Sequence, residues 1–320
     1  MSKAVKKLVI VGGGTAGWLS AAIIAAQHRS NTQDGLQVVL VESSDIPTIG
    51  VGEGTWPTMK NTLQQIGIKE ADLFQRCHAV FKQGGRFVNW VHGNEDFYYH
   101  PFTVPMGYGR IDLAPYVQDI SQFAVESNFQ HQICEAGLAP RGFSEGEYQG
   151  QCNYAYHLDA GAFADLLKEH CKNNLGVQHR IGTVERCQLS QDGQIQALYL
   201  TDGTAPLEAD LFIDCSGFSS LLLGKALGVP FEPVEHLLFN DSALAMQVPY
   251  DTPDAAIPCH TIATAQNAGW IWDIGLTHRR GVGHVYAGKY LSDDEAEFNL
   301  RRYIGPVSYT HLTLPTKRIV

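Results

Sequence analysis

A glycine-rich turn near the N-terminus constrains the fold of this chain more than any other feature. The stretch "VIVGGGTAGW" spaces its glycines as Gly12-x-Gly14-x-x-Gly17. The apolar run at residues 7–11 predicts a β-strand before the turn, and the Ala-rich run at 15–28 predicts a buried helix after it. Glycines at this spacing let the backbone approach a pyrophosphate, whose charge the helix N-terminus stabilises. The turn therefore predicts a dinucleotide-binding βαβ unit.

A second apolar run, at residues 37–42, completes this unit and ends at Glu42. An acidic side chain at that place can accept hydrogen bonds from ribose hydroxyls. A βαβ unit also favours a parallel sheet that is covered by helices. We therefore expect an α/β fold, and its predicted dinucleotide-binding residues are Gly12, Gly14, Thr15, Ala16, Gly17 and Glu42.

The choice between NAD and FAD depends on later segments, because both cofactors use this turn. Residues 43–59 form a glycine-rich loop able to pass close to a flat ligand, and "LFIDCSG" later gives a second strand that runs into a glycine turn. This combination favours FAD and a Rossmann-like core of the glutathione-reductase or aromatic-hydroxylase type. The rival interpretation of Asp214 as a metal ligand is weak, because no His or Cys lies at useful spacing. Further candidate FAD contacts are Gly50, Val51 and Gly52.

The rest of the chain predicts an added β-sheet and long irregular insertions. Residues 159–174 have the pattern of an amphipathic helix that starts at an Asp cap, and the alternating segments around Asp192-Gly193 predict a hairpin. Residues 89–153 are rich in aromatic, Gly, Pro and His residues with little periodicity, as in insertions that cover or line a site. Because no repeat or linker interrupts the pattern, we expect one continuous domain over residues 1–306.

Charge and cysteine usage exclude several classes of function. The formal net charge of -10 argues against nucleic acid and anionic membranes as partners. The seven cysteines include no C-x-x-C pair, which argues against a disulfide framework or a zinc site, so we expect no metal. The N-terminal apolar run is broken by glycines and is too short for a secretory or membrane segment. We therefore expect a cytoplasmic protein.

Several sequence blocks occur in the order, and roughly the spacing, of one enzyme family. They are "VIVGGGTAGWLSAA", "IPTIGVGEGTWP", "VFKQGGRFVNW", "YAYHLDAGAFADLL", "EADLFIDCSGFSSLLLGKALGVPF", "NDSALAMQVP" and "GWIWDIGLTHRRGVGHVYAG". From about Lys7 to about Ile304 the chain resembles the flavin-dependent tryptophan halogenases. The agreement of several unrelated blocks makes this resemblance far more specific than the glycine turn alone.

The resemblance implies a reaction and its partners. Reduced FAD, delivered by a separate flavin reductase, reacts with O₂, and chloride or bromide is oxidised to hypohalous acid. The acid travels through a tunnel to a lysine beside a small aromatic substrate, such as tryptophan or another indole. Lys82 in "FKQGG" matches that lysine. Its ammonium can donate a hydrogen bond to hypohalous acid, or the neutral amine can form a haloamine, which burial would favour.

The resemblance also assigns aromatic site residues. His100 and Phe102 match positions that contact the indole, where aromatic side chains suit an electron-rich bicyclic substrate. Trp270 and Trp272 lie two residues apart, so on a strand they share a face, and they match the tryptophans thought to separate flavin from substrate. Gly275 departs from the proline that the family has there.

The last residues, 307–320, differ from the rest of the chain. Residues 307–316 can be encoded by a transposase-type sequencing adapter, so we expect 307–320 to be a non-native tail without a packing role. The family extends further and carries a catalytic glutamate in an F-L-E-P-L-E-S-T-G-like block that is missing here. We therefore expect a truncated chain that is inactive by itself.

Three functional hypotheses remain open at the level of sequence. The first is the FAD-binding portion of a flavin-dependent halogenase. The second is an FAD monooxygenase that hydroxylates its substrate, against which Lys82 and the tryptophan pair count. The third is a FAD-binding fragment without catalysis.

Overall fold

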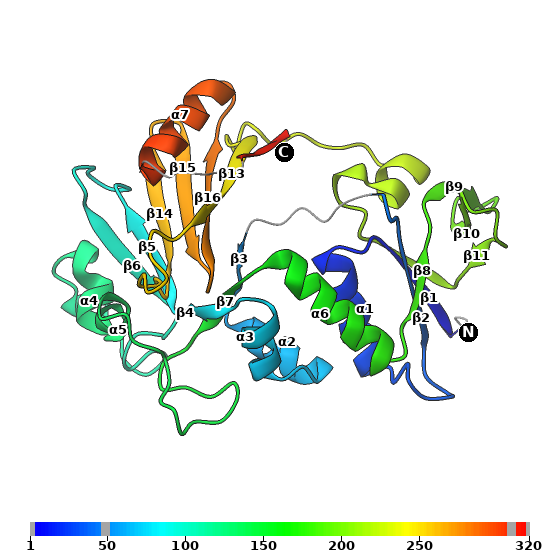
Figure 1. Cartoon of the computed structure of the whole chain (residues 1–320), viewed down its shortest axis with the longest axis horizontal. Coiled ribbons are helices and arrows are strands. Elements are labelled where there is room, and N and C mark those ends of the chain that lie inside the picture. Colours follow the sequence, from blue (N-terminus) through cyan, green and yellow to red (C-terminus); the bar gives the residue numbers. More distant parts are fainter. Residues whose placement is uncertain (1–3, 46–51, 306–311, 318–320) are drawn as a thin grey trace. The chain divides into compact units, whose positions relative to one another are not determined.

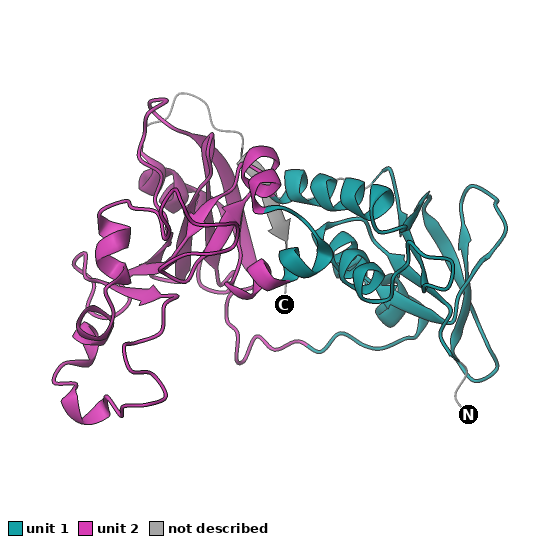
Figure 2. Ribbon diagram, turned by 90° about the horizontal axis from the view of Figure 1, so that it is seen from below, with its two compact units in different colours: residues 1–50, 62–69, 160–232 teal, residues 51–61, 70–159, 233–320 magenta. Residues whose placement is uncertain are grey.

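The chain forms two compact units, each built from several segments. A computed structural model describes residues 4–45, 52–305 and 312–317, the last segment by its backbone alone. Figure 2 colours the units: the first comprises Met1–Gly50, Thr62–Lys69 and Ala160–Glu232, and the second Val51–Asn61, Glu70–Asp159 and Pro233–Val320. Both units are assembled from segments that are distant in the sequence, and the expectation of one continuous domain over residues 1–306 stays a prediction.

The first unit is built on a parallel four-stranded sheet with the order β12-β1-β2-β8. Its inner strands, β1 (Lys7–Val11) and β2 (Gln37–Glu42), are almost entirely buried, as expected for parallel strands that are covered on both faces. The outer strands are β12 (Leu211–Asp214) and β8 (Gln178–Ile181). The predicted βαβ start and parallel sheet are thus confirmed.

Helices α1 (Thr15–Gln27) and α6 (Ala160–Asn173) lie side by side in this unit (Figure 1). Helix α1 buries Trp18 and a row of alanines, and these small residues allow the neighbouring helix to approach closely. Helix α6 buries the apolar stripe that its amphipathic pattern predicted.

A smaller antiparallel sheet, with the order β11-β10-β9, completes the first unit. Strands β9 (Val184–Leu189) and β10 (Ile195–Leu200) form the predicted hairpin, and Gly193 adopts φ +76° in its turn. Leu198 and Leu200 pack in the same core cluster as valines of β1 and β2. The remaining elements are β11 (Leu207–Glu208) and two short helical turns, Gly217–Ser219 and Leu221–Ala226.

The second unit contains a larger mixed sheet with the order β17-β13-β16-β15-β14-β5-β6. All neighbours are antiparallel except β14 and β5. Its strands are β13 (Ser242–Pro249), β16 (Arg279–Tyr286), β15 (Gly269–Gly275), β14 (Thr261–Gln266), β5 (Gly84–Val88), β6 (Phe97–Pro101) and β17 (Leu312–Lys317). Helix α7 (Asp293–Ile304) starts at a Ser292–Glu295 capping box and buries Leu300 against β13 and β16 (Figure 1).

Strand β17 falls in the segment that we expected to lack a packing role. Its backbone pairs with β13, for example Leu312 with Met246. An edge strand presents unpaired backbone groups that accept any extended segment, so this pairing requires no particular side chains. The pairing differs from the expected lack of contacts, and the adapter origin of residues 307–320 stays a prediction.

A three-stranded sheet, with the order β3-β7-β4, carries the predicted catalytic lysine. Strand β7 (Ala155–Leu158) is fully buried between β3 (Glu53–Gly54) and β4 (Val80–Lys82). Nearby helices are α2 (Thr58–Ile66) and α3 (Glu70–Arg76). The insertion at 89–153 is largely irregular, as predicted, with short helices at Ala114–Tyr116, Ile120–Gln122, Phe123–Ser127 (α4) and Gln130–Glu135 (α5).

A buried carboxylate ties α3 to strand β7. Glu70 is 1% exposed, and its Oε2 lies 2.6 Å from Nη1 of Arg141. The hydroxyls of Tyr154 and Tyr156 each donate to Oε1 of Glu70 at 2.7 Å. A buried carboxylate needs such partners because its desolvation is otherwise unfavourable.

Within the described residues, none of the helices combines the length and the apolar character that a membrane-spanning helix requires.

Candidate functional site

The glycine turn has the geometry that a bound pyrophosphate requires. Gly12 adopts φ +117°, and a Cβ atom there would lie 2.1 Å from the carbonyl oxygen of Cys215. A Cβ atom on Gly17 would lie 1.9 Å from the carbonyl oxygen of Gly12. Gly14 differs, because no atom lies within 4 Å of its Cβ position. Two glycines thus pack the turn, while the space beside Gly14 is open at the start of α1, where backbone N–H groups can bind a phosphate.

Glu42 lies directly beside this turn. A Cβ atom on Gly13 would overlap the Glu42 carboxylate, at 1.6 Å from Oε2. The other oxygen, Oε1, lies 2.8 Å from Nζ of Lys168 and 2.7 Å from Nε2 of His179. Burial lowers the pKa of His179, although Glu42 opposes this effect. Lys168 and His179 therefore hold the carboxylate through Oε1, while Oε2 lies beside the glycine turn. This orientation fits the predicted contact with a ribose.

Asp214, at the end of β12, is used within the fold. Its Oδ1 accepts hydrogen bonds from the backbone and hydroxyl of Ser216, and its Oδ2 accepts from the N–H groups of Leu222 and Leu223. Burial alone would raise the pKa of Asp214, but these bonds lower it. The carboxylate of Asp214 therefore caps the following helical turn, and both of its oxygens have hydrogen-bond partners within the fold.

The predicted flavin-loop residues are only partly described. Gly50 and Val51 lie outside the described residues. Gly52 is buried with φ +153°, and its Cβ position lies 3.6 Å from Cδ1 of Leu276 and 3.7 Å from Cα of Gly281. A flavin contact at Gly52 stays a prediction.

In the second unit the structure brings Lys82 together with Phe102 and Trp56. The Nζ atom of Lys82 lies 5.4 Å from the ring centre of Phe102 and 5.5 Å from that of Trp56. Both rings line a cavity of about 460 Å³, which His100 also lines. The cavity wall is largely aromatic and apolar and is formed mainly by β6, the segment after it and α4. This volume suits a bicyclic aromatic ligand.

Lys82 lies in an unusual place for a lysine ammonium. Burial lowers its pKa from 10.5 to about 8. The Cβ position of Gly54, on strand β3 at the other side of β7, lies only 2.9 Å from Nζ. A half-buried lysine with a lowered pKa beside an aromatic cavity is a candidate catalytic group.

Trp56 was missed as a site residue by the sequence analysis. Its side chain is 60% exposed, and its ring centre lies 5.4 Å from that of Phe102 and 6.5 Å from that of His100. The available signal was its position directly after the glycine-rich loop, in "GEGTWP". Its exposed ring, beside Phe102 and His100, makes Trp56 a further candidate contact of the aromatic substrate.

Trp270 and Trp272 lie on β15, with ring centres 6.3 Å apart. Trp90 packs against Trp270 at 6.4 Å, and the Trp272 ring covers Gly283 of β16. Among the described residues, those that line the cavity beside Phe102 include neither tryptophan. Their predicted role between flavin and substrate stays a prediction.

Comparison with known proteins gives a consistent result. Residues 7–314 match the tryptophan halogenase family. The 7-chloro-L-tryptophan 6-halogenase KtzR of Kutzneria sp. is 39% identical over 94% of this chain, and the tryptophan 7-halogenase RebH of Lentzea aerocolonigenes is 34% identical over 92%.

Solved structures agree with this match. The crystal structure of a tryptophan halogenase from Shewanella frigidimarina has a TM-score of 0.90 and 42% identity over 97% of this chain. Tar14, a tryptophan C-6 flavin-dependent halogenase from taromycin biosynthesis, has a TM-score of 0.87 and 36% identity over 98%.

The chain spans only part of the length of these relatives. It covers 62% of KtzR, 58% of RebH and 62% of the Shewanella frigidimarina protein. The family match nevertheless includes almost the whole chain, with both the glycine turn and Lys82. This chain therefore belongs to the tryptophan halogenase family.

Proposed function

We propose that this chain is the FAD-binding portion of a flavin-dependent halogenase that acts on tryptophan or a related electron-rich arene. The observation that carries the proposal is the partly buried ammonium of Lys82 beside the two rings, Trp56 and Phe102, that line the aromatic cavity. An ordinary surface lysine would keep its head group in water. The family membership supports the same assignment.

The glycine turn would hold FAD. The pyrophosphate would lie over Gly14, where the backbone leaves open space, and the N–H groups of Thr15 and Ala16 at the start of α1 would bind it. Glu42, held by Lys168, would accept hydrogen bonds from ribose hydroxyls. When bound and reduced, FAD supplies the electrons with which O₂ and a halide give hypohalous acid. A separate flavin reductase is the expected source of reduced FAD, and the cytoplasm is the expected location.

Lys82 would position the halogenating agent. With a pKa of about 8, the side chain is mostly protonated near neutral pH, so its N–H donates a hydrogen bond to hypohalous acid and polarises the halogen. The neutral minority can form a haloamine instead. Both routes place the halogen beside the rings of Trp56 and Phe102, where a bound indole would stack.

The test uses the full-length protein that contains this chain. Flavin oxidation and halogenated product are followed together with reduced FAD, O₂, tryptophan and chloride or bromide. Lys82→Ala should lower product formation by at least about 100-fold while flavin oxidation continues. Lys60→Ala is a matched control, since Lys60 is also half-buried and lies 4.1 Å from a ring centre, but that ring belongs to Tyr154, which does not line this cavity.

Two outcomes would overturn the proposal. Undiminished halogenation by Lys82→Ala would exclude Lys82 as the catalytic group. A product that gains oxygen, at the same rate with and without halide, would instead identify a hydroxylase.

A further inference from the structure

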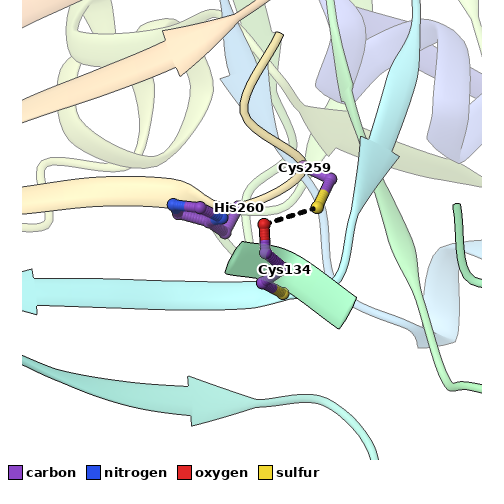
Figure 3. Close-up of side chains that lie close together, drawn as sticks. All are labelled: Cys134, Cys259 and His260. Atoms are coloured by element: carbon purple, nitrogen blue, oxygen red, sulfur yellow. Dashed lines mark hydrogen bonds between the residues drawn. The ribbon is translucent and has the colours of Figure 1, made fainter. Parts of the chain in front are cut away.

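Two cysteines and a histidine from distant parts of the chain meet inside the second unit. Cys134 comes from α5, and Cys259 and His260 come from the segment that leads into β14 (Figure 3). One side-chain ligand atom from each residue lies within 4.8 Å of the other two. The cysteines are 125 positions apart, so no sequence spacing could predict this cluster.

The surroundings of the cluster are those of a closed site. Cys134 and His260 are 5% and 6% exposed, and Cys259 is partly buried. The thiol of Cys259 has a weak hydrogen bond, 4.0 Å long, to the carbonyl oxygen of Cys134. Nδ1 of His260 is buried without a hydrogen-bond partner. A buried ring nitrogen without a partner is unfavourable unless something binds it.

We infer that Cys134, Cys259 and His260 form a binding site for a thiophilic divalent cation such as Zn²⁺. Two sulfurs and one imidazole nitrogen are ligands that Zn²⁺ prefers, and water can complete a tetrahedral shell. Thiolates rather than thiols are metal ligands, so binding would release the thiol protons to solvent, and no oxidant or reductant is needed. The sequence predicted no metal site because Cys134 and Cys259 are far apart in the chain.

The position of the cluster gives such an ion a structural role near Lys82. The N–H of Gln83 donates to the carbonyl oxygen of Cys259 at 2.7 Å, and Gln83 directly follows Lys82. His260 also packs against Tyr99, which lines the aromatic cavity, with ring centres 5.3 Å apart. An ion that joins α5 to residues 259 and 260 would thus fix the segment that presents Lys82.

The test uses the reduced chain after chelator treatment and dialysis, titrated with Co²⁺ and then Zn²⁺. We expect one equivalent of Co²⁺ to give the charge-transfer and d–d absorption of tetrahedral thiolate coordination, which Zn²⁺ then displaces. Zn²⁺ should protect two thiols from a thiol reagent and raise the melting temperature. Cys134→Ser and Cys259→Ser should each weaken binding by more than about tenfold, and His260→Ala should do the same.

Cys187→Ser, on β9 in the other unit, is the control and should bind as the unchanged chain does. Circular dichroism of each variant shows whether a loss of binding is caused by a loss of folding. The Co²⁺ spectrum of the unchanged chain tests the site directly, without any substitution. Absence of thiolate-to-cobalt absorption in that chain would refute the site. A folded Cys259→Ser variant that binds Co²⁺ as tightly as the unchanged chain would refute the site as well. Formation of a disulfide between Cys134 and Cys259, with no metal binding by the reduced chain, would also refute it.

Discussion

Gly14 and Gly17 belong to one motif but serve different purposes. The fold requires glycine at position 17, since a Cβ atom there would overlap the carbonyl oxygen of Gly12. Gly14 faces open space and has φ -76°, which other residues adopt readily. Packing therefore does not require a glycine at position 14, and the open space beside it fits the proposed pyrophosphate position.

This difference gives a prediction that separates binding from folding. Gly14→Val should fold normally but weaken FAD affinity at least about tenfold, the equivalent of about 1.4 kcal/mol, because the side chain would occupy the pyrophosphate position. Gly17→Val should instead lower the melting temperature. Flavin fluorescence quenching and thermal melts measure the two effects, and unchanged affinity in Gly14→Val would exclude the predicted pyrophosphate position.

The lowered pKa of Lys82 predicts a pH-dependent stability. Between about 8 and 10.5 the unfolded chain binds this proton and the folded chain does not, so the free energy of unfolding contributed by Lys82 rises with pH across that window. Lys82→Met removes a charge whose burial is unfavourable. The variant should gain about 1–2 kcal/mol near neutral pH, and the gain should shrink toward pH 10.5.

Urea unfolding of both chains at neutral and alkaline pH measures this gain. Lys69→Met is the control, because Lys69 is exposed and its charge remains hydrated. A gain that stays constant with pH would show that the methionine stabilises by packing alone.

The sequence indicated the glycine turn because its contacts are local. Gly12, Gly14 and Gly17 lie within one turn, so their spacing alone predicted a tight turn before α1, and their contact with FAD stays a prediction. Lys82 required the family resemblance, and the cavity beside it joins Trp56 to Phe102, which are far apart in the chain. Cys134 and Cys259 had no signal at all, since only the folded chain brings them together.

At the scale of elements, the buried carboxylate of Glu70 organises strand β7 and helix α3. Two tyrosine hydroxyls and Arg141 depend on it, so its loss would leave several buried polar groups without partners. Strand β7 in turn pairs with β4, which carries Lys82. The network therefore supports the strand that presents the predicted catalytic lysine.

Glu70→Ala should lower the free energy of unfolding by about 3–5 kcal/mol, as expected when one partner of a buried ion pair is removed. Glu297→Ala is the matched control. Its carboxylate pairs with Arg301 on the exposed face of α7 and should contribute only about 0.3–0.5 kcal/mol. Chemical denaturation of both variants tests the comparison, and equal losses would contradict the role assigned to the buried network.

The sequence indicated elements better than it indicated their assembly. Strands β1 and β2, helices α1 and α6 and the hairpin of β9 and β10 follow from local periodicity and turn residues. The larger sheet could not be predicted in this way, because β5 pairs with β14, more than 150 positions later, through backbone hydrogen bonds that carry no sequence signal. For the same reason the sequence does not indicate which segments make up each unit.

At the scale of the whole molecule, the chain combines a complete glycine turn with only part of its relatives' length. The groups proposed to bind the pyrophosphate and ribose of FAD, from Gly12 to Glu42, lie in the first unit, and the candidate flavin contact Gly52 belongs to the second. The block that carries the family's glutamate does not occur among these 320 residues, whereas Lys82 is present. We therefore expect this chain to bind the cofactor without halogenating a substrate.

We predict that the 320-residue chain binds FAD but forms no halogenated product with reduced FAD, O₂, tryptophan and halide. Lys82 can position hypohalous acid, but a carboxylate is still needed to orient the acid and take the proton from the arene. Flavin fluorescence and product mass are measured on this chain and on a version extended by the C-terminal part of a relative. We expect both to bind flavin and only the longer one to halogenate. Halogenation by the 320-residue chain would show that Lys82 and the described residues suffice, and the glutamate would then lose its assigned role.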